Sequence, residues 1–325
     1  MAAGNYQADI HNSDYEAEYR AKKLDARGLI NIDGRKLESL NGLWNFAPDL
    51  YDSCRRAHWW RQRTEKKVPG NKPEDWDAEA WETMPVPSCW NMERSEYLYF
   101  EAAGIYTRTF HYYAQKKDER AFLFFEGASY AASVFLNGEY LGTHWGASTP
   151  FCVEISGSVQ EFNRIIVTVD ARRSPLRIPT DNTDWFNYGG LYRDVYLLRT
   201  GPSFIKDWFI RLVKGVEIRA DISIEGESAG LELEIPELKI REKLPVRDGK
   251  ASLRLKASPQ LWSPENPKLY DFTLKLAESS GEDDAGGRIE DRIGFREICT
   301  RGEEIFLNGK KIFLKGICVH EDHFK

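Results

Sequence analysis

Asn-Gly and Asp-Gly pairs divide this chain of 325 residues into short segments. Asn-Gly occurs at 41–42, 137–138 and 308–309, and Asp-Gly occurs at 33–34 and 248–249. These residues tolerate the positive φ that tight hairpin turns require. Runs rich in β-branched and aromatic residues flank several of the pairs, for example 133–136 and 163–170. Because helical signals are sparse, the pattern predicts an all-β protein.

Residues 216–276 alternate between apolar and polar side chains with a period of two. This period places one face of a strand on a core and the other face in water. Several such strands at short spacing are typical of a β-sandwich. The alternating apolar positions are Ala220, Ile222 and Ile224; Leu231, Leu233 and Ile235; Ala251, Leu253 and Leu255; and Phe272, Leu274 and Leu276.

Charge and hydropathy exclude several classes of partner. Lys and Arg number 45 against 51 Asp and Glu, a net charge of −6, so we expect no nucleic-acid partner. No apolar run approaches the ~18 residues of a membrane helix, and the polar N-terminus has no apolar stretch typical of a signal peptide. The five cysteines are scattered and form no CxxC pair. We therefore expect free thiols and a cytoplasmic location, without membrane contact.

Two composition changes suggest domain boundaries. Nine of the ten tryptophans lie at or before Trp208, so a first boundary is placed at the turn-like Thr200-Gly201-Pro202. A second falls near Ile298, after the acidic, Gly-rich segment 278–287. The last segment predicts a hairpin around Asn308-Gly309, followed by an apolar strand over 311–319. We expect that strand to need a cover that the remaining residues up to Lys325 do not supply.

Seven motifs follow one another along the chain, at 40–46, 86–91, 104–108, 134–151, 184–195, 261–270 with 293–296, and 306–316 with 320–322. Together they resemble family 2 of the glycoside hydrolases, the β-glucuronidase and β-galactosidase group. The segment 184–195 is more similar to β-glucuronidases than to β-galactosidases. One departure is Gly146-Ala147-Ser148, where the family often has Gly-Gly-Tyr. Seven motifs in the family's order are far more specific than any one of them.

The resemblance implies a jelly-roll β-sandwich followed by an immunoglobulin-like β-sandwich and a short stub of a (β/α)8 barrel. On this basis residues 1–27 are a polar N-terminal extension and residues 28–200 are the jelly-roll sugar-binding domain. Residues 201–298 are the immunoglobulin-like β-sandwich. Residues 299–325 carry the first strand of the catalytic barrel, which normally needs about 250 residues.

The same resemblance implies a reaction class that this chain alone cannot perform. Members of the family are retaining glycosidases, which use two carboxyl groups about 5–5.5 Å apart. In the family both are glutamates on later barrel strands, the acid/base within an Asn-Glu pair, and this chain has no Asn-Glu pair. We therefore expect no catalytic residue, no metal and no cofactor. The chain is predicted to be the non-catalytic N-terminal portion of a β-glucuronidase-like enzyme.

Two residues are predicted to contact the sugar by resemblance, Asp184 and His320. An Asp accepts hydrogen bonds from sugar hydroxyls, and a neutral His both donates and accepts them. The competing interpretation of Asp184 is a turn residue, because 180–184 is rich in turn formers. His320 with His323 has the wrong spacing for two metal ligands on adjacent helical turns. Trp59-Trp60 is a candidate sugar platform, although such side chains more often pack in cores.

Three hypotheses about partners follow. In the first, the chain helps to form the pocket for a β-glycoside within a longer enzyme. In the second, a separate chain carries the barrel and covers the apolar strand over 311–319. The alternative, from a different class, is a stand-alone carbohydrate-binding module without hydrolase activity. Members of the family often oligomerise, which leaves a homo-oligomer open.

Overall fold

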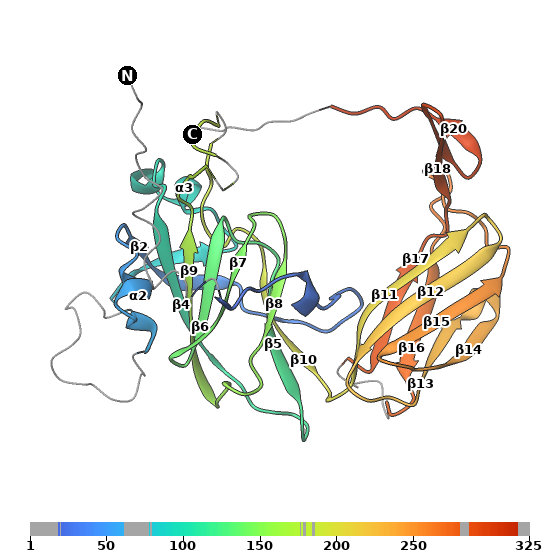
Figure 1. Cartoon of the computed structure of the whole chain (residues 1–325), viewed down its shortest axis with the longest axis horizontal. Coiled ribbons are helices and arrows are strands. Elements are labelled where there is room, and N and C mark those ends of the chain that lie inside the picture. Colours follow the sequence, from blue (N-terminus) through green and yellow to red (C-terminus); the bar gives the residue numbers. More distant parts are fainter. Residues whose placement is uncertain are drawn as a thin grey trace. The chain divides into compact units, whose positions relative to one another are not determined.

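The computed structural model describes residues 19, 21–61, 78, 80–175, 177, 180–183, 186–279 and 286–317. Within this part, regular structure is almost entirely β-strand (Figure 1). The predicted all-β fold class is confirmed. The chain divides into two compact units, the first formed by Met1–Leu29 and Leu37–Leu198 and the second by Ile30–Lys36 and Arg199–Lys325.

Two sheets build the first unit. All the strand pairs of the larger sheet and the two outer pairs of the smaller sheet are antiparallel. The larger sheet has the order β3-β2-β4-β9-β6-β7, with β2 (Gly42–Asp49), β3 (Glu82–Val86), β4 (Ala103–His111), β6 (Ala131–Leu136), β7 (Glu139–Trp145) and β9 (Phe162–Asp170). The smaller sheet has the order β1-β10-β5-β8, with β1 (Glu38–Ser39), β5 (Arg120–Phe125), β8 (Phe151–Glu154) and β10 (Val195–Thr200). Short helical turns lie between strands: η1 (Ala26–Gly28), α2 (Ser53–Arg56), η2 (Trp59–Arg61), α3 (Trp90–Glu93) and η4 (Ser95–Tyr97).

The core of the first unit lies between these two sheets. Trp44 of β2 and Tyr106 of β4 are fully buried in one apolar cluster with Leu123 and Phe125 of β5. Neighbouring residues on the same strands point the other way, as Ile105 of β4 does. The larger sheet therefore has an inner face on the smaller sheet and a separate outer face.

The outer face of the larger sheet is also covered. Ile105, Phe135 and Ile166 form a second cluster with Cys54 of α2, Trp60 of η2 and Tyr19. Tyr19 is only 1% exposed, and its ring packs edge-to-face with the Phe135 ring, with the two ring centroids 6.2 Å apart. Part of the polar extension at 1–27 thus packs on the sheet. The apolar positions there are too few for local patterning to reveal this packing.

The second unit is another sandwich. One sheet has the order β11-β12-β15, with β11 (Phe204–Val213), β12 (Glu217–Glu225) and β15 (Lys250–Lys256). The facing sheet has the order β14-β13-β16-β17, with β13 (Gly230–Ile235), η5 (Pro236–Leu238) after it, β14 (Ile240–Pro245), β16 (Tyr270–Leu276) and β17 (Arg288–Ile293). The alternation predicted over 216–276 is confirmed, because all twelve apolar positions belong to or pack against one core cluster.

A small sheet follows, of β18 (Ile298–Arg301), β19 (Glu304–Leu307) and β20 (Lys310–Ile312). Asn308, in the turn between β19 and β20, connects this small sheet to the second sandwich by hydrogen bonds. The Asn308 side chain accepts a hydrogen bond from the Glu297 backbone at 3.0 Å and donates one to the Trp262 carbonyl at 2.9 Å. Its own backbone N donates to the Glu297 carbonyl at 2.8 Å.

Ile30–Lys36 belongs to the second unit although it precedes β1. The side chain of Asn31 donates to Asp207 at 3.2 Å. The guanidinium of Arg35 donates to the Asn31 carbonyl at 2.6 Å and lies over the Trp208 ring at 5.8 Å. The chain therefore passes from the first unit to the second before β1, and again within β10.

The Asn-Gly and Asp-Gly pairs divide into two groups. Asn137-Gly138, Asp248-Gly249 and Asn308-Gly309 have positive φ at both residues, the geometry of a type I′ turn. At Asn41-Gly42 and Asp33-Gly34 only the glycine has positive φ. Neither closes a two-residue hairpin between paired strands, and the hairpin expectation is wrong there. Asn41 instead donates to the Asp194 carboxylate at 3.0 Å while the chain passes from β1 to β2 in the other sheet.

Separate cores predict separate responses to mutation. Leu274 is fully buried opposite Leu233 in the second sandwich, and Leu274→Ala should lower the free energy of unfolding of that unit by about 3 kcal/mol. Hydrogen exchange read by mass spectrometry should show the loss of protection in the second unit and not in the first. Leu269→Ala, at a position 39% exposed, is the control. An equal loss of protection in both units would contradict the prediction.

Candidate functional site

Asp184 and His320, the two predicted sugar contacts, lie outside the described residues. The segment around Asp184 can still be built from its neighbours. We call residues 171–190 the 171–190 loop; it leaves β9 and leads toward β10. Within it, 171–175, 177, 180–183 and 186–190 are described.

The loop begins at a buried carboxylate. Asp170, the last residue of β9, is 3% exposed. Arg172 forms hydrogen bonds to both its oxygens, at 2.8 and 2.6 Å, and Arg177 donates to it at 3.0 Å. Asp52, which precedes α2, and Arg55, within α2, extend this network. The Arg172 guanidinium lies 3.8 Å from the Asp52 carboxylate, and the Arg55 guanidinium lies 4.0 Å from the Asp170 carboxylate. The network joins three parts of the unit: the segment around α2 that covers the outer face of the larger sheet, strand β9 and the 171–190 loop.

The environment of Asp170 favours its ionised form. Burial by itself would raise its pKa, because a charged group loses water. Hydrogen bonds from Arg172, and the charge and hydrogen bond of Arg177, outweigh burial and place the pKa of Asp170 well below its usual value. The same hydrogen bond raises the pKa of Arg172. The charged pair is therefore the stable state of the loop base.

Arg173 spans the middle of the loop. Its Nε lies 2.9 Å from the Glu101 carboxylate, and its Nη1 donates to the Thr183 carbonyl at 2.7 Å. Thr180 and Thr183 close a turn on each other, with backbone and hydroxyl hydrogen bonds of 3.0–3.2 Å. The residue immediately before Asp184 is thus held to the segment that precedes β4.

The loop ends against a second anchor, Asn91 in α3. The Asn91 side chain is 2% exposed, accepts a hydrogen bond from the Gly189 backbone at 2.8 Å and donates to the Tyr97 carbonyl at 3.0 Å. Trp90 N donates to the Gly189 carbonyl at 3.1 Å. Asn187 closes the loop on itself by donating to the Ala171 carbonyl at 2.5 Å.

The paired glycines allow this close approach. A Cβ atom added to Gly189 would overlap the indole ring of Trp90. Gly190 has φ +133°, and a Cβ there would lie 2.8 Å from the Ser88 carbonyl and 2.9 Å from the Tyr106 hydroxyl. Glycine is needed at 189 for space and at 190 also for conformation.

Three sequence motifs therefore meet at this loop. Trp90 and Asn91 come from the motif at 86–91, Tyr106 comes from 104–108, and Gly189 comes from 184–195. Although they are far apart in the sequence, they form one packed unit. Sequence reasoning did not identify the partners Asp170 and Arg173, yet a signal existed: an Asp at the end of an apolar strand, followed by two arginines.

Aromatic side chains accompany the loop. The rings of Phe186 and Tyr188 lie 4.8 Å apart, and Tyr99, 75% exposed, lies 6.2 Å from Phe186. Flat apolar rings can contact the C–H faces of a sugar. Among the described residues, no group of three or more His, Cys, Asp or Glu side chains is placed to hold a metal ion. None of the described helices is long and apolar enough to cross a membrane.

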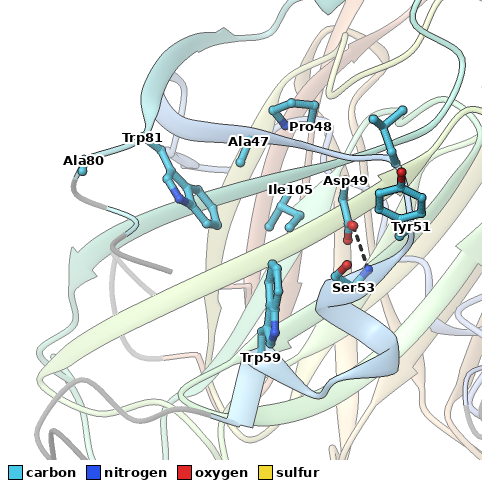
Figure 2. Close-up of a pocket in the computed structure, with 10 residues that line it drawn as sticks. Ala47, Pro48, Asp49, Tyr51, Ser53, Trp59, Ala80, Trp81 and Ile105 are labelled. Carbon is cyan, nitrogen blue, oxygen red and sulfur yellow. Dashed lines mark hydrogen bonds between the residues drawn. The ribbon is translucent and has the colours of Figure 1, made fainter. Parts of the chain in front are cut away.

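The two adjacent tryptophans have different environments. Trp60 is 4% exposed, stacks on Phe135 at 5.0 Å and donates to the Tyr19 hydroxyl at 3.0 Å, so it is a core residue. Trp59 is partly exposed and lines a pocket on the outer face of the larger sheet (Figure 2). The pocket has a volume of about 490 Å³ and also includes Trp81.

Comparisons with known families decide the family. A model described as "Glycosyl hydrolases family 2, sugar binding domain" matches residues 37–201, and a model of "Glycosyl hydrolases family 2" matches residues 203–296. The chain belongs to family 2 of the glycosyl hydrolases. The resemblance noted in the sequence motifs is confirmed.

Relatives and solved structures agree with this family. A β-glucuronidase of Paenibacillus borealis is 26% identical over 321 residues, which cover 89% of this chain and 50% of that protein. A mouse β-glucuronidase is 27% identical over 334 residues, which cover 89% of this chain and 48% of that protein. The chain therefore spans about half the length of the curated relatives it matches.

Two solved structures have a similar fold. The Bifidobacterium dentium β-glucuronidase complexed with coumarin-3-O-glucuronide superimposes with a TM-score of 0.72 at 23% identity, covering 89% of this chain and 52% of that one. The β-galacturonidase of Eisenbergiella tayi bound to galacturonate gives 0.66 at 29% identity, covering 90% and 49%.

Gly189→Ala tests the close packing at the end of the loop. The added methyl group has no space beside Trp90, so we expect the free energy of unfolding of the first unit to fall by about 3 kcal/mol. Thermal unfolding measures the effect. Gly157→Ala, in the same unit, is the matched control because a Cβ there meets no atom within 4 Å. Equal melting temperatures for the two variants would contradict the packing argument.

Asp170→Asn tests the buried charge. It leaves two arginines without their carboxylate, so we expect a loss of about 3 kcal/mol at pH 7. The folded state depresses the pKa of Asp170, so its stabilisation is present above the unfolded value near 4 and is lost as the pH falls below that value. The difference between the natural protein and the variant should narrow between pH 5 and about pH 3 in denaturant titrations. Asp181→Asn, in an exposed turn of the same loop, should change little.

Proposed function

We propose that this chain is the non-catalytic N-terminal portion of a retaining β-glycosidase, and that the substrate of the whole enzyme is a β-uronide. The observation that carries the proposal is a family match over both sandwiches combined with coverage of about half of each β-glucuronidase relative. The β-galacturonidase at 29% identity, bound to galacturonate, supports the uronide class.

In this proposal the 171–190 loop presents Asp184 to the sugar. The loop is held at its start by Asp170, in its middle by Arg173 and at its end by Asn91. Anchoring a loop on both sides of a contact residue reduces the entropy lost on binding. Asp184 would accept hydrogen bonds from sugar hydroxyls.

The second proposed contact, His320, follows the small sheet. Apolar side chains at the C-terminal end of the described residues are exposed: Phe313 by 83%, Leu314 by 66% and Ile317 by 89%. We propose that a (β/α)8 barrel covers them, in the same polypeptide or in a separate chain. The strand ends of that barrel would then bring His320 and the two glutamates to the same mouth.

A cytoplasmic location is also part of the proposal. None of the described cysteines Cys54, Cys89, Cys152 and Cys299 is in a disulfide, which suits a reducing compartment. Burial raises the pKa of the Cys54 and Cys89 thiols and keeps them in the unreactive protonated form.

The first test is the coding sequence downstream of Lys325. If it encodes a barrel with an Asn-Glu pair, the continuous protein should release the chromophore of an aryl β-glucuronide faster than that of an aryl β-galactoside. The 325-residue chain alone should release neither, because retention requires a nucleophilic carboxylate. Hydrolysis by the purified chain alone would overturn the non-catalytic assignment.

Asp184→Asn in the continuous enzyme tests the sugar contact. Loss of a charged hydrogen bond should lower kcat/KM for the aryl glycoside about tenfold to a hundredfold. Asp181→Asn, three residues earlier, should leave kcat/KM within about twofold of the natural enzyme. If the two variants behave alike, Asp184 is a turn residue and the contact is refuted.

A further inference from the structure

The pocket on the outer face of the larger sheet is built by four segments of the first unit. Ala47 and Asp49 of β2 and Ile105 of β4 form its floor. Trp59 of η2 forms one wall, and Trp81, just before β3, forms another (Figure 2). The pocket lies on the opposite side of the larger sheet from the core between the two sheets, and none of its described lining residues belongs to the 171–190 loop.

The two tryptophans give the pocket flat apolar surfaces. In Figure 2 the rings of Trp59 and Trp81 both point into the space beside Ile105. Tyr51, 75% exposed, adds a third ring at the rim. Aromatic faces make favourable contact with the C–H groups of a pyranose, which small aliphatic side chains do not match. A volume of about 490 Å³ is within the usual range for small-molecule sites.

A fixed carboxylate gives the pocket its polarity. Asp49 is 4% exposed, and its two oxygens accept hydrogen bonds from the backbone N–H groups of Ser53 at 2.7 Å and Cys54 at 2.9 Å. These bonds and a hydrogen bond from the Ser53 side chain hold the carboxylate in place. Of its roughly four acceptor positions, one is left for a further donor. The Ser53 side chain also lines the pocket.

These features suit a sugar. A pyranose presents C–H faces that indole rings can contact and hydroxyl groups that can donate to a carboxylate. Asp49 is the one charged side chain among the lining residues that the structure describes. A second negative charge in this partly buried space would be repelled, so a uronate is disfavoured.

We propose that this pocket is a binding site for a neutral pyranose. The sugar stacks on Trp59 and Trp81, and its hydroxyls donate to Asp49. This site is separate from the uronide pocket of the proposed enzyme and does not depend on that proposal, because all the lining residues that the structure describes belong to the first unit.

The test is ligand-observed NMR of the 325-residue chain at pH 7.5 with four probes. The neutral probes are methyl β-D-glucoside, methyl β-D-galactoside and methyl β-D-mannoside, and the charged probe is methyl β-D-glucuronide. We expect saturable binding of at least one neutral probe, and binding of the glucuronide at least about tenfold weaker. Absence of binding by every neutral probe, or equal binding of the glucuronide, would overturn the proposal.

Variants then assign the binding to this pocket. Trp59→Ala and Trp81→Ala should each weaken the neutral sugar about tenfold. Trp59→Phe and Trp81→Phe, which keep a ring, should weaken it less and remain informative if an alanine variant fails to fold. Tyr113→Ala removes a ring of the same unit that is 59% exposed and lies outside the pocket, and it should leave the affinity unchanged. Unchanged affinity in both tryptophan variants would refute the assignment.

Asp49→Asn tests whether the charge of Asp49 acts on the ligand. The quantity measured is the preference for the neutral sugar over the glucuronide, which a purely structural role of Asp49 would not change. Without the charge, the preference for the neutral sugar over the glucuronide should shrink several-fold, while an amide oxygen still accepts a hydrogen bond. A preference that is unchanged in Asp49→Asn would show that the carboxylate does not face the ligand.

Discussion

A carboxylate buried at the end of β9 ties together three parts of the first unit. Asp170 must be paired, because an isolated buried charge costs several kcal/mol. Its arginine partners come from the 171–190 loop, and the neighbouring pair Asp52–Arg55 comes from the segment that covers the outer face of the sheet. The cover, the strand end and the loop therefore share one charge network. Each of them is positioned by the need to keep that network complete.

How well the sequence predicted the fold depends on the range of the interactions. Strand alternation in the second sandwich was read correctly, since period-two patterning acts within a few residues. The turn at Asn137-Gly138 was also local and predictable. Asn41-Gly42 was not, because a hydrogen bond to Asp194 decides its conformation. Tyr19 was equally hidden, since its burial depends on Phe135 and on Arg55, whose guanidinium lies over its ring at 5.2 Å.

The candidate site shows the same division. The motif containing Asp184 was identified from the sequence, and the structure places its glycines against Trp90 and Asn91 of another motif. Asp184 and His320 themselves stay predictions. The adjacent residues Trp59 and Trp60 have different environments that the sequence does not distinguish. The Trp60 ring packs in a core cluster, and the Trp59 ring faces a pocket. No local pattern separates two neighbouring tryptophans, because the choice is made by the curvature of the short turn that carries them.

The placement of Ile30–Lys36 in the second unit affects how the two bodies can be made and separated. During synthesis this short piece leaves the ribosome long before its neighbours: the carbonyl of Glu290 lies against Gly34, some 250 residues later. The rest of the first unit, residues 37–198, is synthesised before the strands that this piece packs against. A gene cut at the junction near residue 200 would deliver a C-terminal fragment without that piece. The two modules, although each has its own core, are interlaced in the order of the chain and are not exchangeable as simple head and tail cassettes.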